Sequence, residues 1–126
     1  MAAPIVPIHI VDFLRQTVRS NWGLEVLLLL RSTHTRTWSA SELCNEIRGS
    51  IPLVQDILDT YVRAQLVRHE TPGKYRYAPI DAHADSIVTE LTQLHAEYPL
   101  ALIKEIIRTP NEKIKMFVDA FRLKKD

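Results

Sequence analysis

Positively charged side chains that can bind phosphate groups gather in one short segment, residues 66–79. Glu70 is the only acid in this segment. Lysine and arginine contact the phosphates of a nucleic-acid backbone through charge, independently of the base sequence. We therefore predict contacts to phosphate groups by four residues of the segment: Arg68, His69, Lys74 and Arg76.

Two tyrosines, Tyr75 and Tyr77, alternate with Arg76 in the same segment. Successive residues of a β-strand point to opposite sides, and aromatic residues at this spacing face the core more often than they stack on bases. We expect both tyrosines to be part of the core.

The residues that could perform catalysis or bind a metal are not arranged in any known catalytic or metal-binding motif. The sequence has no glycine-rich phosphate loop, HExxH, CxxC or nucleophile elbow, and its single cysteine, Cys44, cannot form an internal disulfide. Asp81-Ala-His83 and His95-Ala-Glu97 resemble the zinc-binding pattern of ArsR-like regulators. The two histidines are 12 residues apart, however, which places them about 120° apart on a helix. The sequence therefore predicts no enzyme, no cofactor and no metal site.

The composition is that of one folded globular domain. Of 126 residues, 46% are hydrophobic and 25% are charged, and the net charge of +1 means that any basic surface is local. The N-terminal MAAPIVPIHIVDF lacks the features of a signal peptide. The longest aliphatic run, residues 26–30, is far shorter than a bilayer span of about 20 residues. We expect a single cytoplasmic domain over 1–126 without a membrane segment.

Helical periodicity and capping residues organise the first part of the chain. Residues 7–20 have apolar side chains at helical spacing, and Ser20 or Asn21 can cap a second, largely apolar helix, WGLEVLLLLRS. Ser39 and Glu42 form a capping box that opens a third helix, ASELCNEI.

A tight turn and a fourth helix follow. In Arg48-Gly49-Ser50, the glycine is available for a left-handed conformation. Ser50 then caps a helix with Pro52 in its first turn, and this helix is expected to reach about residue 64.

The pattern next changes to two short segments rich in β-formers, LVRHE and YRYAP. They are joined by a Pro-Gly pair, which favours a type II turn and predicts a β-hairpin over 66–79. Asp81 is expected to cap a helix over 82–97, and Pro99 to start another that runs to 108. A second capping box at 109–112 predicts a last helix to about 123, within a C-terminal segment, 104–126, that holds seven Lys/Arg and four acids.

The helix expected over 51–64 has an apolar and a polar face. At about 100° per residue, one side carries Val54, Ile57, Leu58, Tyr61 and Gln65. The opposite side has two acidic residues and one positively charged residue. The phosphates of DNA repel acidic side chains, so this helix is poorly suited to contact the edges of the DNA bases directly. The candidate contact residues at this helix are Ser50, Pro52, Gln55, Asp56, Asp59 and Arg63.

The helix expected over 82–97 has a narrow apolar seam, because its apolar residues recur at alternating steps of three and four. Such a seam is typical of helices that pair, and we interpret it as the contact of a homodimer. The seam residues are Ala84, Ile87, Leu91, Leu94 and Tyr98.

The order of these elements resembles a winged helix-turn-helix, a mainly α fold with a small β-hairpin wing. The stretches that carry the resemblance are RTWSASELCNEI, RGS, IPLVQDILDTYVRAQLV, LVRHE and YRYAP. They lie in a core over 21–80, flanked by helices in 1–20 and 81–126, a layout similar to that of MarR-like and PadR-like bacterial regulators. The resemblance implies a dimeric transcriptional regulator that binds double-stranded DNA.

The acidic helix over 51–64 leaves a second interpretation open. A winged helix can also be a protein–protein interaction module that does not bind DNA, with Ile51, Pro52 and Leu53 as its contact surface. A dimer whose two wings form one continuous positive face favours DNA, whereas scattered or neutralised basic residues favour a protein partner.

Overall fold

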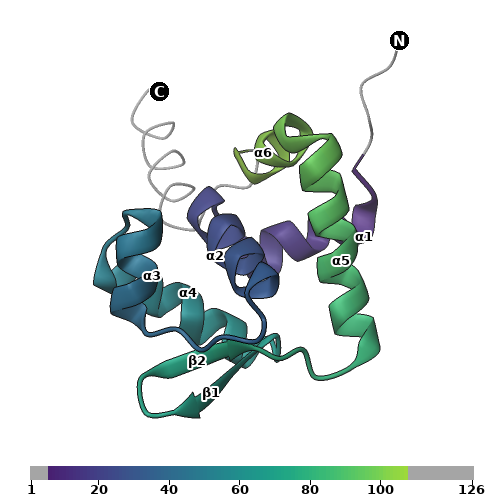
Figure 1. Ribbon diagram of the computed structural model, residues 1–126. Coiled ribbons are helices and arrows are strands. Elements are labelled where there is room, and N and C mark those ends of the chain that lie inside the picture. Colours follow the sequence, from purple (N-terminus) through teal and green to yellow (C-terminus); the bar gives the residue numbers. More distant parts are fainter. Residues whose placement is uncertain (1–5, 108–126) are drawn as a thin grey trace, which may run out of the picture.

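The computed structural model describes residues 6–107, and its elements follow the predicted order (Figure 1). They are α1 (Ile8–Phe13), the π-helical η1 (Leu14–Val18), α2 (Asn21–Ser32), α3 (Ala40–Ile47), α4 (Ile51–Arg63), β1 (Val67–Thr71), β2 (Lys74–Tyr77), α5 (Ala82–Glu97) and α6 (Pro99–Ile107). The last helix predicted from the sequence, and most of the C-terminal basic segment, lie outside the described residues.

Four of the predicted helix caps are confirmed, and the capping box predicted at 109–112 lies outside the described residues. Ser20 Oγ accepts a hydrogen bond from Gly23 N at 3.0 Å, and Asp81 Oδ1 accepts one from Ala84 N at 2.8 Å. Ser39 forms the reciprocal capping box, and Ser50 Oγ accepts from Leu53 N at 3.3 Å. Each cap satisfies a backbone N–H that has no partner inside its own helix, so these short polar side chains fix where the helices begin.

Two local expectations were wrong. Arg48, and not Gly49, adopts the left-handed conformation after α3, with φ of 59°. Gly49 N donates instead to Cys44 O, which closes the helix end. Gln65, expected on the core face of α4, is exposed because the helix ends before it and the chain turns through a φ of 62°.

The first helix is also less regular than predicted. After α1, residues 14–18 form a π-helical turn in which Arg19 N donates to Leu14 O at 2.7 Å. This wider turn keeps both Leu14 and Val18 buried, and Arg19 then ends the helix with a φ of 69°.

Helix α2 lies at the centre of the molecule, between the α3–α4 pair and the α5–α6 pair (Figure 1). Its residues Val26, Leu27 and Leu30 are fully buried. From α4, the buried Tyr61 donates its hydroxyl to Gly23 O at 2.5 Å. Burial raises the pKa of this phenol, so Tyr61 stays a hydrogen-bond donor.

The wing is an antiparallel hairpin in which Val67 pairs with Tyr77 and His69 with Tyr75. Gly73 has a φ of 79°, as the predicted type II turn requires. Trp38 and Tyr75 exchange two backbone hydrogen bonds, of 2.7 and 2.8 Å, which attach the hairpin to the segment before α3. Tyr75 and Tyr77 are buried, as predicted.

Helix α3, the turn, α4 and the attached hairpin together form a winged helix-turn-helix, so the predicted fold class is confirmed. The flanking helices α1, α5 and α6 complete the core. Within residues 6–107, no helix is long and apolar enough to cross a membrane.

Candidate nucleic-acid interface

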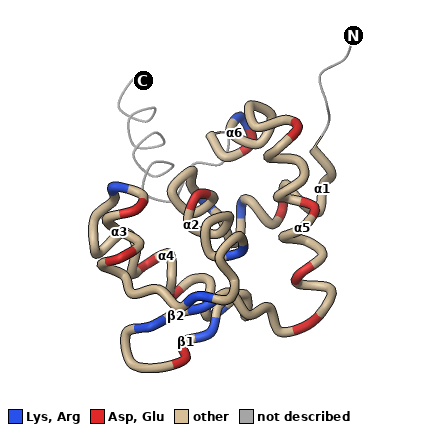
Figure 2. Tube along the Cα trace, viewed as in Figure 1, with Lys and Arg blue, Asp and Glu red and all other residues tan. Residues whose placement is uncertain are grey.

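Four cations on the outside of the hairpin and the adjoining segment share two carboxylates. We define the wing surface by these six residues: Arg36, Arg68, Lys74, Arg76, Glu42 and Glu70. Figure 2 shows the basic residues along the hairpin and the acidic residues of α3 and α4 beside them.

Glu70 lies between two of the predicted contact residues. Its carboxylate forms an ion pair with Arg76, and Arg68 Nη1 is 3.9 Å from Glu70 Oε1. Arg68 remains 65% exposed and Arg76 37%, while Glu70 is 23% exposed. Both guanidinium groups are therefore open to a further anion.

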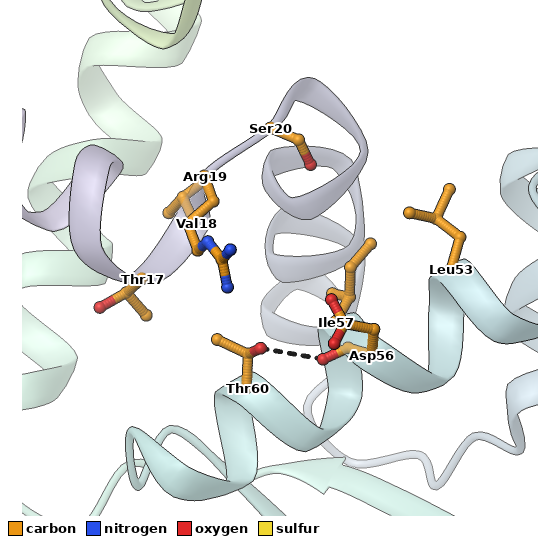
Figure 3. Close-up of a pocket in the computed structure, with 8 residues that line it drawn as sticks. All are labelled: Thr17, Val18, Arg19, Ser20, Leu53, Asp56, Ile57 and Thr60. Carbon is orange, nitrogen blue, oxygen red and sulfur yellow. Dashed lines mark hydrogen bonds between the residues drawn. The ribbon is translucent and has the colours of Figure 1, made fainter. Parts of the chain in front are cut away.

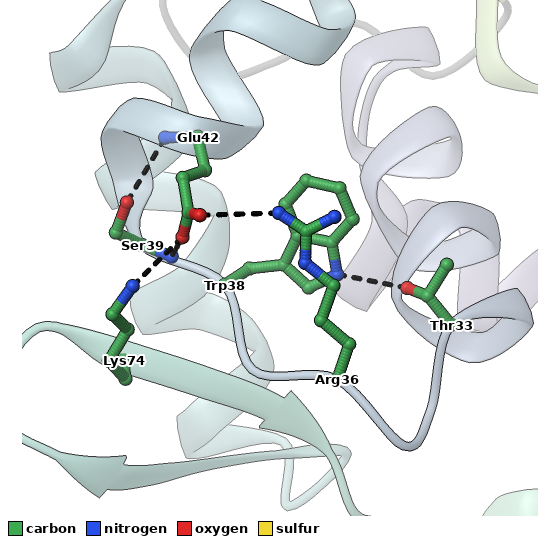
Figure 4. Close-up of polar contacts among 6 residues, drawn as sticks. All are labelled: Thr33, Arg36, Trp38, Ser39, Glu42 and Lys74. Atoms are coloured by element: carbon green, nitrogen blue, oxygen red, sulfur yellow. Dashed lines mark hydrogen bonds and ion pairs between the residues drawn. The ribbon is translucent and has the colours of Figure 1, made fainter.

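Glu42 joins the start of α3 to the wing (Figure 4). Its Oε1 accepts from Ser39 N at 2.8 Å and from Lys74 Nζ at 3.0 Å, and its Oε2 pairs with Arg36 Nη2 at 3.2 Å. The Ser39 backbone hydrogen bond, followed by the Lys74 ammonium, lowers the pKa of Glu42 from 4.5 to about 2. Glu42 is therefore a carboxylate at neutral pH.

Arg36 was not among the residues predicted from the sequence. Its guanidinium lies 3.5 Å from the ring centroid of Trp38, and the indole Nε1 donates to Thr33 Oγ1 at 2.9 Å (Figure 4). A cation over an aromatic ring is attracted by the negative face of the ring. No sequence signal placed Arg36 there, because its position depends on the bridge between Trp38 and the wing.

The shared carboxylates leave the wing surface with a surplus of positive charge. Four cations and two carboxylates give a formal excess of two charges. Exposed ion pairs contribute only about 0–1 kcal/mol, so these pairs do not prevent the cations from binding phosphate instead.

His69 is occupied within the hairpin. Its Nε2 accepts from Gly73 N at 2.9 Å, and its ring stacks on Tyr75 with centroids 4.5 Å apart. The Tyr75 hydroxyl in turn accepts from Gln55 Nε2 at 3.0 Å, and the same nitrogen lies 2.9 Å from Asp59 Oδ1. This chain of contacts fixes the wing against α4.

The outward face of α4 is acidic. Pro52, Asp56, Asp59 and Arg63 are exposed, and Ile51 is 45% exposed beside them. Ser50 Oγ accepts the N-cap hydrogen bond and Gln55 Nε2 donates to the Tyr75 hydroxyl, so both predicted contact residues already have hydrogen bonds within the chain.

A small hollow of about 160 Å³ lies between α4 and the segment in which η1 ends and leads into α2 (Figure 3). Arg19 and Asp56 both line it, from opposite sides, and no ion pair joins them within the described chain. Thr60 donates its hydroxyl to the backbone carbonyl of Asp56, so this hydrogen bond does not involve the Asp56 carboxylate.

The predicted seam residues differ in burial. Leu91 is fully buried within the core of its own chain, next to the buried Val88. Ala84, Ile87 and Leu94 are half-buried, and Tyr98 is 43% exposed. Only the last part of the predicted seam therefore presents a large accessible apolar side chain.

The structure gives the wing surface an acid-sensitive link at Glu42. Because the folded pKa of about 2 lies below the ordinary 4.5, the contribution of this group to stability is present above pH 4.5 and is lost as pH falls toward 2. We expect Glu42→Gln to lack this loss. Urea unfolding is measured at about pH 6, 4 and 2. Over this range, the free energy of unfolding of the wild type should fall relative to that of the variant. Parallel curves for the two proteins would contradict the role of Glu42.

No group of three potential metal ligands among His, Cys, Asp and Glu occurs in the described part of the chain. His83 and His95 lie near opposite ends of α5.

The fold and the wing surface define a winged helix-turn-helix protein. No protein-family model and no curated protein matches the chain. Among solved structures, the chain is similar to a cysteine-to-serine mutant of MarR from E. coli, with a TM-score of 0.47 and 16% identity over 98% of both chains. It is also similar to wild-type apo MarR from E. coli, with a TM-score of 0.44 and 16% identity over 97% of this chain and 98% of that one. The class assignment rests on the arrangement of this chain's own helices and hairpin.

Proposed function

We propose that this chain binds double-stranded DNA through the wing surface and acts as a winged-helix transcriptional regulator. The observation that carries the proposal is the surplus of two positive charges on an exposed hairpin. Phosphates attract such cations without regard to base sequence, and a hairpin is narrow enough to follow the backbone.

Helix α4 has a different part in this proposal. Asp56 and Asp59 repel nearby phosphates, and Gln55 is held by Tyr75. The α4 face therefore limits how closely the duplex approaches, and the wing supplies most of the attraction. Affinity then depends more on salt than on base sequence.

The test is fluorescence anisotropy with a random-sequence duplex at low and moderate salt. Wild type should bind, with an affinity that falls steeply as salt rises. A variant with Arg68, Lys74 and Arg76 changed to alanine should bind at least about tenfold more weakly, and its salt slope should be smaller by about two to three.

A matched variant tests the acidic helix separately. Asp56→Asn with Asp59→Asn removes two negative charges from α4 and leaves the wing unchanged, so DNA binding should become tighter. Circular dichroism confirms that both variants are folded. Absence of binding by wild type even at low salt would rule out the proposal.

A second candidate function is docking of a protein partner on α4. The exposed Ile51 and Pro52 beside the carboxylates of Asp56 and Asp59 favour it, because they offer an apolar contact next to negative charge. Such a partner carries basic residues around an apolar side chain. In this case Asp56→Lys with Asp59→Lys abolishes the interaction, whereas the wing variant retains it.

We also propose that the chain forms a homodimer through the outer side of α6 and the end of α5. Leu100 is 70% exposed and Ile107 74% exposed, and Tyr98 precedes them. Apolar side chains this exposed are stabilised when a second copy covers them.

A further inference from the structure

The hollow between η1 and α4 has room for one aromatic side chain. Its volume is about 160 Å³, and an apolar protein cavity of about 150 Å³ is large enough to bind benzene. Val18, Leu53 and Ile57 give the hollow apolar walls, and Asp56 lines it on the α4 side, opposite Arg19 (Figure 3). The hollow can therefore receive an aromatic ring that has a positive charge next to it.

The outward face of α4 continues this surface with apolar and acidic side chains. Ile51 is 45% exposed, and Pro52, Asp56 and Asp59 are exposed as well. Asp59 accepts a hydrogen bond from Gln55, but neither aspartate forms an ion pair within residues 6–107. An apolar contact beside two unpaired carboxylates favours an occupant that is apolar on one side and positively charged around it.

The chain itself contains a segment with this chemistry. We define the C-terminal tail as residues 108–126, which follow α6. The tail holds six lysine or arginine residues and three acidic residues. Its sequence predicts a helix with lysines around an apolar side that consists of Ile114, Phe117, Val118 and Phe121. The tail therefore offers aromatic rings to the hollow and positive charges to the two aspartates.

The tail starts at a place from which it can reach α4. Helix α6 packs against η1 through its buried Leu102 and Ile106, and η1 in turn lines the hollow. Even a fully helical segment of this length spans almost 30 Å at about 1.5 Å per residue, roughly the diameter of a small domain. A short tether gives an effective concentration on the order of millimolar, so the tail of the same chain has an advantage over that of a second copy.

We propose that the C-terminal tail docks on the outward face of α4 in its own chain. A phenylalanine ring fills the hollow, and lysine or arginine side chains pair with Asp56 and Asp59. Arg19 repels cations, so the positive charges of the tail lie on the Asp56 side of the hollow. The docked tail covers the part of α4 that a protein partner would otherwise contact. The proposal does not rest on DNA binding, because it uses none of the six residues of the wing surface.

Paramagnetic NMR on the full chain measures this contact directly. A spin label is attached through Ala120→Cys in a Cys44→Ser background, which leaves the label a single site. The amide signals of Ile57 and Thr60 should broaden more strongly than that of His83 at the start of α5. Equal broadening at all three residues, or none at α4, would overturn the proposal.

A mixed sample identifies which chain supplies the tail. Isotope-labelled protein without a spin label is combined with spin-labelled protein without the isotope. Docking within one chain predicts no broadening at Ile57 and Thr60 in this mixture. Broadening there would mean that a second copy supplies the tail, which would overturn docking within one chain.

Two variants test the two halves of the contact. Asp56→Lys with Asp59→Lys turns the attraction into repulsion, and Phe117→Ser with Phe121→Ser removes the rings, so each pair should abolish the selective broadening at α4. Glu46→Lys with Glu97→Lys makes the same change in charge at exposed positions outside α4 and should leave the broadening as in wild type. Circular dichroism checks that each variant is folded. Selective broadening that survives in either of the first two variants, or is lost in the control, would contradict the proposed contact.

Discussion

Gly23→Ala is expected to destabilise the protein by about 3 kcal/mol, although alanine is the better helix former. A Cβ at this position would lie 2.2 Å from the carbonyl oxygen of Val18 and 3.2 Å from the hydroxyl oxygen of Tyr61. The first of these atoms belongs to the backbone and cannot rotate away. The clash can be relieved only if the π-helical turn and α2 move apart. That movement also stretches the hydrogen bond from the Tyr61 hydroxyl to Gly23 O.

Urea unfolding followed by tryptophan fluorescence measures this effect. The matched control is Gly49→Ala, where a Cβ would meet only Ile47 and Val54 side-chain atoms at 3.5 and 3.6 Å. Because Gly49 does not have a positive φ, alanine fits there without strain. It should stabilise the protein by roughly 0.4–1 kcal/mol, because it lowers the conformational entropy of the unfolded chain. If both variants unfold at the wild-type midpoint, the close approach at Gly23 is not a constraint on the fold.

Leu91→Ala is the second variant with a large expected effect. It should lower the free energy of unfolding by about 2–5 kcal/mol. Leu91 is fully buried within one chain, next to the likewise buried Val88, so truncation leaves a cavity that its neighbours cannot fill. The loss should appear in urea unfolding and should not depend on protein concentration.

A contrast with α6 tests the proposed dimer contact. Leu100→Lys removes an apolar side chain that is 70% exposed, so its effect on unfolding should stay within about 0.5 kcal/mol. The same change should shift the protein toward monomer in sedimentation experiments, in accord with the proposed dimer. If Leu91→Ala instead gave a stable monomer with an unchanged free energy of unfolding, Leu91 would have to lie in a contact between two chains.

The candidate interface followed only partly from the sequence. The basic residues of the hairpin and the acids of α4 were visible as local patterns, because each set lies within a few residues along the chain. The partners of those residues were not visible. Lys74 pairs with Glu42 across 32 positions, and Gln55 reaches Tyr75 across 20. No periodicity within one segment reports such a contact.

The alternating seam in 82–97 shows the same limit. Spacing places apolar residues on one side of a helix but does not say which chain covers that side. The structure places Leu91 against the core of its own chain and leaves large exposed apolar residues on α6.

By itself, the sequence determined the element order, the caps and the buried tyrosines, because these depend on residues within about one turn or one strand of each other. Only the tertiary structure decided which charges meet on the wing surface, that Arg48 and not Gly49 takes the left-handed conformation, and that Arg19 and Asp56 line one hollow. These features depend on how separate elements pack, and packing brings together residues whose distance along the chain carries no signal.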